Sequence, residues 1–459
     1  MHIESLEIEN IKGFERLELG TGSDRPLSKG MNVFVGGNAS GKTTLLKCIA
    51  MAVMGADDAN FSIISTRGWV RQTKFAVQGK IDLKIAHEEA DAFEMKLNEG
   101  SLKQTMGASL LFSGNRNSLQ PTLTPELRGI NSFFENAHVM RTELIDGSIQ
   151  NDRFAMWNPD ERGWFICAYG VARRLSGGTN GSSRLASRGG KVVSCSSLFD
   201  EGADLYGGHA WLLNLHAVKQ EQELQKNEVS PLFDKIWDLL NDGLLPEGFS
   251  LQRVSHADKE IYVKAPNGAE ISMNDLSDGC RSIYSLILNI IMHMIPAYHT
   301  ADLFDKDSEG RVIVNKPGVV LIDELEAHLH PTWQQKICDW LKTRFPNVQF
   351  FVTTHSPLIA QAADEGGLFV LPMAHELAQG RKVHRLSSEE QERVTLGGAE
   401  GVLLSEAFSL DYTWSNETQQ IVQEWERMEQ RKNAGEQFTP IEVARYEELK
   451  RQLRITFAV

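Results

Sequence analysis

The sequence contains 459 residues, 41% of them hydrophobic, and carries a formal net charge of −14 at pH 7. Because this length exceeds the usual size of a single hydrophobic core, we expect one large domain or two ordinary ones in a globular, soluble protein. The acidic charge argues against wholesale wrapping of nucleic acid and leaves only a local basic patch as a possible contact.

The cysteines and the apolar segments indicate the cellular compartment of the protein. The five cysteines lie far apart without a C-x-x-C pair, which is typical of reduced thiols in a cytoplasmic protein without structural zinc. Residues 1–19 alternate polar and apolar side chains and do not resemble a signal peptide. The longest apolar run, residues 283–295, is interrupted by polar residues, and we expect it to be too short to cross a bilayer.

The N-terminal part predicts a strand, a glycine-bearing loop and a helix. Residues 1–19 read as two paired strands that turn at Lys12-Gly13, and residues 31–35 form a short apolar strand. The loop that follows fits G-x-x-x-x-G-K-T and leads into a helix, a setting in which inward-pointing N–H groups form a cradle for phosphate. Lys42 would reach the β- and γ-phosphates and Thr43 would hold Mg²⁺. The residues predicted to bind a nucleoside triphosphate are Gly36, Gly37, Asn38, Ala39, Ser40, Gly41, Lys42 and Thr43.

Strand-like alternation returns after the first helix, over residues 69–86 and 93–97, and predicts a sheet over the nucleotide. Gln72 and Gln78 are both candidates for a side chain that contacts metal or water. Their spacing does not choose between them, and an exposed strand glutamine explains each equally well. Residues 100–160 are expected to contain mixed short strands and helix.

Arginines and a glycine-rich tract follow. Residues 164–175 read WFICAYGVARRL, in which Arg173 and Arg174 could face nucleotide, nucleic acid or an interface glutamate, or form a surface pair. Residues 177–197 are rich in glycine and serine, and we expect a mobile loop that contacts nucleic acid or a partner. Its cationic residues are Arg184, Arg188 and Lys191.

The next stretch predicts helices, a hairpin and a second anion site. Helices are expected over residues 203–245, without a heptad array long enough for an extended coiled coil. A hairpin turns at Pro266-Asn267-Gly268. Ser277 and Gly279 then stand at the start of a nearly all-apolar helix, where backbone N–H groups favour an anion, although the same residues are ordinary helix caps.

The third motif is a buried strand, residues 318–322, that ends in two acids. At the carboxyl edge of a sheet, Asp323 would coordinate Mg²⁺ and Glu324 would orient or deprotonate the attacking water. A zinc site is a weaker alternative, because catalytic zinc ligands normally come from separated segments or helical spacings. The residues of that alternative are Glu326, His328 and His330.

A histidine completes the set. Pro331 is expected to begin a helix, and residues 348–352 form a strand that leads to His355. Beside the two acids, His355 can hydrogen-bond the γ-phosphate or the water. A purely structural histidine is the alternative, and its place at the strand end favours function.

The order of these motifs resembles that of the ABC-type ATPases of the SMC and RecF kind. The stretches IESLEIENIKGF, DELEAHLHP and TTHSPLI are similar to the OLD-like branch, and YGVARRL is similar to the ATPase subunit of Septu and related retron anti-phage systems. OLD nucleases carry a TOPRIM domain after the ATPase, and no such acidic motif is found in this sequence. We therefore expect any nucleic-acid cleavage to come from another protein.

The resemblance implies an α/β ATPase head with a β-sheet lobe, a helical insertion and a C-terminal helical extension. The expected bounds are 1–100 for the lobe with the phosphate loop, 101–270 for the insertion, 271–399 for the second ATPase lobe and 400–459 for the extension. It also implies that two subunits sandwich two ATP molecules head to tail, with Ser277 and Gly279 acting from the opposite subunit. The site residues of one subunit would then be Lys42, Thr43, Thr44, Asp323, Glu324 and His355, with Mg²⁺ on Thr43 and Asp323.

The C-terminal extension predicts two helices, over residues 416–431 and 439–453, each with an apolar stripe. They would pack on their own ATPase core or form a docking surface for a companion subunit. Trp425 is the expected anchor of such a surface.

These features support an ATP-hydrolysing regulatory subunit of a bacterial defence complex that controls a partner nuclease, of the HNH type by resemblance. A DNA-repair or DNA-clamping ATPase is one alternative, disfavoured by the acidic charge and missing heptads. A defence ATPase of the PARIS type with a TOPRIM partner is another. A transporter ATPase is disfavoured by the SMC-like N-terminus, and no membrane contact is expected.

Overall fold

The computed structural model describes residues 2–22, 24–63, 68–71, 78–86, 105–113, 165–173, 185, 189–203, 205–298, 303–408, 410, 413 and 415–456. Its centre is a six-stranded sheet in the order β15-β14-β3-β13-β12-β6, parallel except at the β14–β15 edge. Strands β6, β12 and β13 are wholly buried, as expected of near-continuous apolar runs in a sheet covered on both faces. The strands are β3 (Met31–Gly36), β6 (Ile166–Tyr169), β12 (Gly318–Ile322), β13 (Val348–Thr354), β14 (Leu368–Leu371) and β15 (His384–Arg385).

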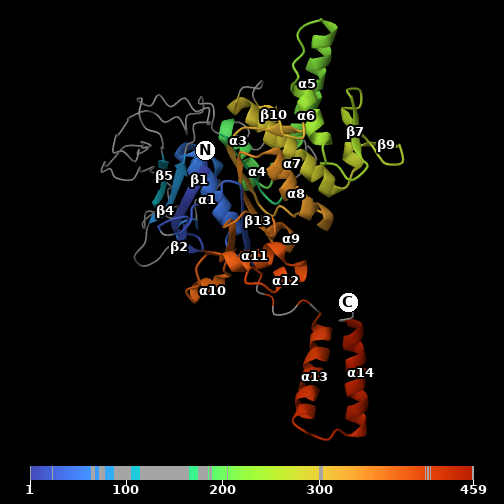
Figure 1. Cartoon of the computed structure of the whole chain (residues 1–459). Coiled ribbons are helices and arrows are strands. Elements are labelled where there is room, and N and C mark those ends of the chain that lie inside the picture. Colours follow the sequence, from blue (N-terminus) through green and yellow to red (C-terminus); the bar gives the residue numbers. More distant parts are fainter. Residues whose placement is uncertain are drawn as a thin grey trace.

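A second, antiparallel sheet has the order β2-β1-β4-β5. Helix α1 (Lys42–Met54) contacts strands of both sheets and is buried almost all round, which explains its largely apolar sequence (Figure 1). Gln349 of β13 joins the sheets, because its side chain accepts a hydrogen bond from Ile3 N (2.7 Å) and donates to the carbonyls of Ile3 (2.9 Å) and Ser28 (2.7 Å). The strands of this sheet are β1 (His2–Ile11), β2 (Phe14–Leu19), β4 (Gln78–Ala86) and β5 (Thr105–Ser113).

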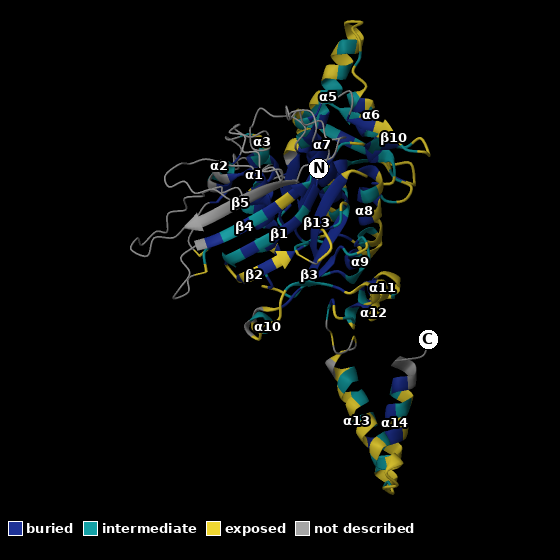
Figure 2. Cartoon of the chain, turned by 60° about the vertical axis from the view of Figure 1, so that its left-hand side comes forward, coloured by how far each residue is buried: buried dark blue, intermediate teal, exposed yellow. Residues whose placement is uncertain are grey.

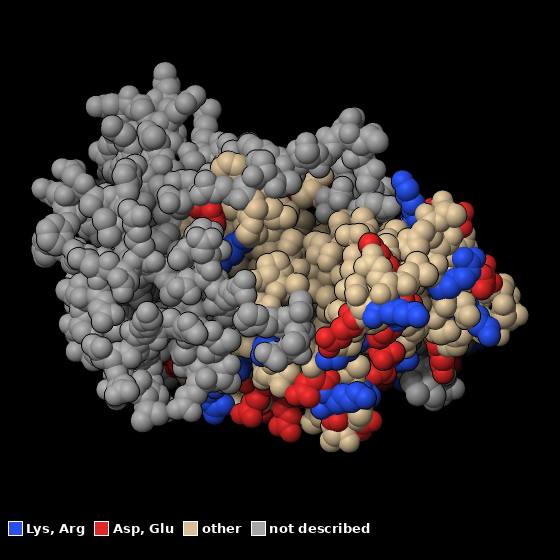
Figure 3. Space-filling view, turned by 90° about the horizontal axis from the view of Figure 1, so that it is seen from above, with Lys and Arg blue, Asp and Glu red and all other residues tan. Residues whose placement is uncertain are grey.

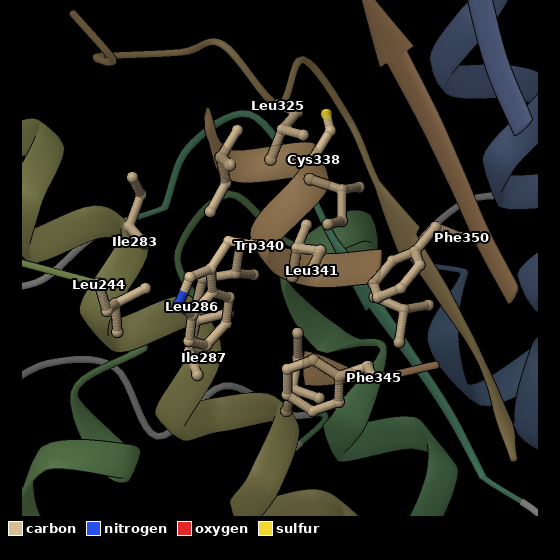
Figure 4. Packing of buried hydrophobic residues seen from close by; sticks show 14 of the residues in the cluster. Leu244, Ile283, Leu286, Ile287, Leu325, Cys338, Trp340, Leu341, Phe345 and Phe350 are labelled. Atoms are coloured by element: carbon tan, nitrogen blue, oxygen red, sulfur yellow. The ribbon is translucent and has the colours of Figure 1, made fainter. Parts of the chain in front are cut away.

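Helices cover the opposite face of the central sheet and enclose the larger of the two main cores. Apolar residues of α7 and α8, including Leu286, Ile287, Trp340 and Leu341, pack together beside the strands (Figure 4). The predicted helices, the predicted hairpin and the helix expected at Pro331 are all present. These elements are α5 (Tyr206–Leu224), α6 (Leu232–Asn241), β7 (Ser250–Ser255), β8 (Glu260–Lys264), β9 (Glu270–Ser272), α7 (Asp278–Met294), β10 (Phe304–Lys306), β11 (Val312–Val314) and α8 (Pro331–Arg344).

The helical stretch that contains the apolar run 283–295 extends beyond the run on both sides. Within the described residues, one helical stretch, Asp278–Ala297, is long and apolar enough to cross a membrane by length and composition. Of its most apolar window, 61% is buried inside the protein, where α7 packs against α5.

The segment expected to be a mobile loop over residues 177–197 has structure at its end. Val192, Cys195 and Leu198 are buried, and they hold two short helices against the sheet edge. The glycine and serine content concealed these apolar anchors; Arg184 and Arg188 lie outside the described residues. The remaining short helices are α2 (Ala56–Ser62), α3 (Gly190–Ser194), α4 (Ser196–Phe199), α9 (Pro357–Ala360), α10 (Ala374–Ala378), α11 (Ser388–Leu396) and α12 (Ala399–Leu403).

The C-terminal extension is a helical hairpin, α13 (Asn416–Asn433) and α14 (Pro440–Thr456), that projects from the body in both views (Figures 1 and 2). Its interior is a small separate core around Met428, Tyr446 and Leu449. An ion pair between Arg445 and Glu424 links the helices. Packing of these helices onto the rest of the chain, one of the two sequence-based alternatives, is therefore wrong.

All five cysteines are free and buried. Burial raises the pKa of Cys195 and of Cys338 to about 12. The five are Cys48, Cys167, Cys195, Cys280 and Cys338.

Candidate functional site

The phosphate loop lies between β3 and α1 and has the backbone that its glycines allow. Gly41 has φ of 97° and Ala39 has φ of 62°, both in the left-handed region. A Cβ at Gly41 would lie 2.7 Å from the ring of Phe14, and one at Gly36 would lie 2.6 Å from a backbone oxygen of Leu371. The loop is thus enclosed by β2 and β14 at its base, while Asn38 and Ala39 at its tip are exposed.

Two side chains of the loop have polar groups suited to phosphate. Lys42 is buried and its Nζ donates to the carbonyls of Gly36 (2.9 Å) and Gly37 (3.0 Å). Burial lowers the pKa of Lys42, while Glu324 and Asp323 act in the opposite direction. The Oγ of Ser40 is buried and has no hydrogen-bond partner among the described residues. A buried hydroxyl without a partner fits a loop that receives an oxygen-rich ligand.

Three residues from separate elements meet at one carboxylate. Thr43 Oγ1 donates to Asp323 Oδ2 (2.6 Å), and Thr353 Oγ1 donates to Asp323 Oδ1 (2.5 Å). Asp323 is only 2% exposed. Hydroxyl and carboxylate oxygens are the ligands that Mg²⁺ prefers, so the pair of Thr43 and Asp323 fits this ion. Thr44, in the next position, is half-buried in the first turn of α1.

Glu324 lies beside His355 at the carboxyl ends of β12 and β13. The distance from His355 Nε2 to Glu324 Oε1 is 3.8 Å, and each side chain is 36% exposed. Glu324 has a left-handed backbone, with φ of 46°, and its N–H donates to Thr353 Oγ1 (2.8 Å). The strand order therefore brings Lys42, Thr43, Asp323, Glu324 and His355 to one edge of the sheet.

Glu326 holds the strand end in place. Its carboxylate accepts hydrogen bonds from Thr354 Oγ1 (2.7 Å) and from the backbone N–H of His355. His330 instead caps α8, where its ring accepts from Thr332 N (3.3 Å). Among the described residues no group of three metal-binding side chains exists, so the zinc alternative gains no support.

Ser277 and Gly279 occupy the start of α7, and no described hydrogen bond joins them to the phosphate loop. Ser277 Oγ donates to Cys280 Sγ (3.1 Å). A Cβ at Gly279 would lie 2.5 Å from the carbonyl oxygen of His328, so only glycine lets α7 approach the segment after the two acids so closely.

Other predicted contacts are only partly described. Gln72, Arg174, residues 93–97 and most of residues 177–188 lie outside the described residues. Gln78 begins β4, where its backbone pairs with Ser113 of β5. On the face seen in Figure 3, the described Lys and Arg side chains lie among Asp and Glu and do not form a broad basic area.

Sequence reasoning missed Thr353 and left the role of Arg173 open. Thr353 was not singled out, although it contacts both acids. Arg173 is 5% exposed and donates to the carbonyl of Asp323 (3.1 Å), so the surface pair, one of its sequence-based alternatives, is wrong for this residue. Its position four residues after the end of the buried strand β6 was the available signal of burial.

Two parts of the chain match families of known proteins. Residues 5–161 match a family described as "AAA domain", and residues 208–360 match one described as "AAA domain, putative AbiEii toxin, Type IV TA system". "Septu protein PtuA" of Bacillus mycoides (strain KBAB4) is 24% identical over 412 residues, 89% of this chain. "Retron Vc95 probable ATPase" of Vibrio cholerae is 37% identical over 109 residues, 24% of this chain and 19% of the relative, and "Retron Ec83 probable ATPase" of Escherichia coli is 35% identical over 124 residues, 27% of this chain and 21% of the relative.

The chain is similar in sequence to Septu PtuA and to the retron ATPases. The match with PtuA spans 45% of that relative's length, so this chain spans less than half of the curated relatives it matches first. Among solved structures, an SMC head bound to the C-winged helix domain of ScpA aligns with 85% of this chain and 99% of its own, with a TM-score of 0.46 and 15% identity.

Proposed function

We propose that this chain binds and hydrolyses ATP as the regulatory subunit of a bacterial anti-phage defence complex in the cytoplasm. The observation that carries the proposal is the junction of Thr43, Asp323 and Thr353, which joins the phosphate loop to the two acids by hydrogen bonds of 2.6 and 2.5 Å. Homology to PtuA and to retron ATPases supports the defence role.

Each site residue has a distinct task in this proposal. Lys42 and the loop N–H groups bind the phosphates, and Ser40 offers its unpaired hydroxyl. Thr43 and Asp323 would hold Mg²⁺, which supplies positive charge that neutralises the phosphate oxygens. Glu324 orients or deprotonates the attacking water. His355, 3.8 Å from Glu324, donates a hydrogen bond to the γ-phosphate or the water.

The proposed active form is an oligomer. Ser277 and Gly279 make no described hydrogen bond to their own phosphate loop, and we infer that they complete the site of a second subunit bound head to tail. ATP between the subunits would then control assembly, and assembly would control a partner nuclease, of the HNH type by resemblance to Septu. The projecting hairpin of α13 and α14 is the proposed partner-binding element.

The first test is phosphate release by the purified chain with ATP and Mg²⁺. Lys42→Ala should abolish nucleotide binding and turnover, whereas Lys264→Ala, at an exposed lysine on β8, should leave both unchanged. Equal turnover by wild type and Lys42→Ala, or none by wild type with its partner present, would remove the ATPase assignment.

The neighbouring gene tests the partner. An HNH gene that protects cells against phage only together with this chain would support the proposal. A TOPRIM gene would favour the PARIS-type arrangement, and a permease gene would contradict both.

A further inference from the structure

Arg173 is a buried cation bound by backbone oxygens. It follows β6, and its Nε donates to the carbonyl of Gly170 (3.3 Å). Its two terminal nitrogens donate to three successive carbonyls after β12, those of Asp323 (3.1 Å), Glu324 and Leu325 (3.5 Å). No carboxylate of the described residues forms an ion pair with it.

Burial of this cation is costly, so its contacts must matter to the segment that they hold. Burial lowers the pKa of Arg173 to about 10, and Glu326, Asp323 and Glu324 act in the opposite direction. The guanidinium therefore remains protonated at neutral pH. A guanidinium presents several N–H groups in a rigid fork, which suits it to hold successive carbonyls in one fixed arrangement.

The segment that Arg173 holds contains a strained residue. Glu324 has φ of 46°, and the left-handed region is unfavourable for a residue with a Cβ. Two contacts retain this conformation: Thr353 Oγ1 accepts from the N–H of Glu324 at 2.8 Å, and Arg173 donates to its carbonyl oxygen. The direction of the Glu324 side chain follows from that backbone.

We propose that Arg173 is a positioning residue that holds the backbone of Asp323, Glu324 and Leu325 so that the Glu324 carboxylate stays beside His355. This inference rests on the proposed hydrolysis of ATP and deepens it. Arg173 does not touch the phosphate loop in any described hydrogen bond, so its effect would pass through Glu324. It should therefore affect the chemical step and leave nucleotide binding nearly unchanged.

The test compares two substitutions with a matched control. Arg173→Lys keeps the charge and loses the fork, and Arg173→Met fills the space without charge. Arg344→Lys is the control. Arg344 is also buried (4% exposed), but it is the last residue of α8 and bonds to Asp242 after α6. We expect Arg173→Lys to lower kcat at least about tenfold with KM for ATP changed less than about threefold, as removal of an interaction specific to the transition state predicts. Arg344→Lys should keep kcat within about twofold at a comparable loss of thermal stability.

A double-mutant cycle separates positioning from general stabilisation. If Arg173 acts through Glu324, Arg173→Lys should cause no further loss of kcat in a Glu324→Gln background. Equal fold losses in both backgrounds, or wild-type kcat in Arg173→Lys, would overturn the inference. If Arg173→Met fails to fold, the lysine variant decides. Absence of turnover in the wild-type protein would instead contradict the proposed function itself.

Discussion

At Asp323, two threonines from elements far apart in the sequence share one carboxylate. Thr43 lies in the first turn of α1 and Thr353 near the end of β13, and their hydroxyls donate to different oxygens of Asp323. The carboxylate is nearly inaccessible to water, which strengthens these bonds relative to an exposed site. A movement of Thr43 would therefore act on Asp323, the residue directly before Glu324.

The first prediction concerns Glu324. Glu324→Gln should retain ATP binding and lower the rate of hydrolysis at least about a hundredfold, because an amide cannot accept the proton of the attacking water. Binding of a fluorescent ATP analogue and phosphate release are the measurements. Glu392→Gln, on exposed surface of α11, is the control. Undiminished turnover would remove Glu324 from this role.

A second prediction tests whether the site is shared between subunits. Ser277→Arg should retain ATP binding and lose hydrolysis, because the serine acts on the opposite subunit's nucleotide. Lys42→Ala cannot bind ATP and is also inactive alone. Mixing the two variants should restore part of the wild-type hydrolysis, because a mixed pair of subunits contains one intact site. Absence of recovery at every mixing ratio, with subunit exchange demonstrated by labelled chains, would indicate a self-contained site.

The sequence predicted the residues that gather at the carboxyl edge of the sheet better than those that hold them. Lys42 and Thr43 belong to a local pattern, and Asp323 and Glu324 follow a recognisable buried strand. The role of Arg173 depends on β6 lying next to β12, and that of Thr353 on β13 lying on the other side. Strand order is a non-local property that periodicity does not reveal.

At the scale of elements, the two sheets enclose α1, and polar links join them. Gln349 is one of them, since it is fully buried in β13 yet bonds to Ile3 of β1 and to Ser28. A glutamine in a buried strand has no signal of this role in the sequence. Its side chain satisfies the hydrogen-bonding groups of the backbone where the start of β13 meets the start of β1.

The third prediction follows from that link. Gln349→Leu should lower the free energy of unfolding by about 2–4 kcal/mol, because each buried polar group left without a partner costs about 1–3 kcal/mol. Urea unfolding followed by circular dichroism measures the change. Gln335→Leu on exposed surface of α8 should alter it by less than about 0.5 kcal/mol. Similar stability of both variants would show that the joint between the sheets relaxes freely.

Element prediction from the sequence was accurate where periodicity or turn residues were strong. The paired strands at the N-terminus, the Asn267-Gly268 turn and the two C-terminal helices were all predicted. It failed for α3 and α4, because their few apolar anchors are spaced among glycine and serine.

For the molecule as a whole, the projecting hairpin is the feature with the clearest functional consequence. Deletion of residues 417–459 should leave ATP hydrolysis and the thermal transition of the body nearly unchanged, because the hairpin has its own small core. Co-purification with the neighbouring gene product should be lost. Precipitation or inactivity of the shortened chain would place the hairpin in the body and the partner surface elsewhere.

The structure changes how the hairpin surface is tested. Trp425, the expected anchor, packs against the hairpin's own core, so Trp425→Ala would loosen the hairpin itself. Ile441 and Val443 of α14 are 82% and 48% exposed and are better placed for a partner. Ile441→Ser with Val443→Ser should weaken co-purification while the hairpin remains folded, and unchanged binding would exclude both side chains as partner contacts.

Because all five cysteines are buried, their reaction with a thiol reagent can measure how often the protein opens. A thiol reacts as the thiolate. Burial blocks access to all five thiols and raises the pKa of Cys195 and Cys338, so the native protein should label slowly with a thiol-reactive dye and completely in denaturant. Cys280, 9% exposed at the start of α7 beside Ser277, should react first. If a second subunit covers that helix end when ATP is present, ATP should slow the labelling of Cys280. Mass spectrometry of the labelled peptides would measure the labelling of each cysteine separately.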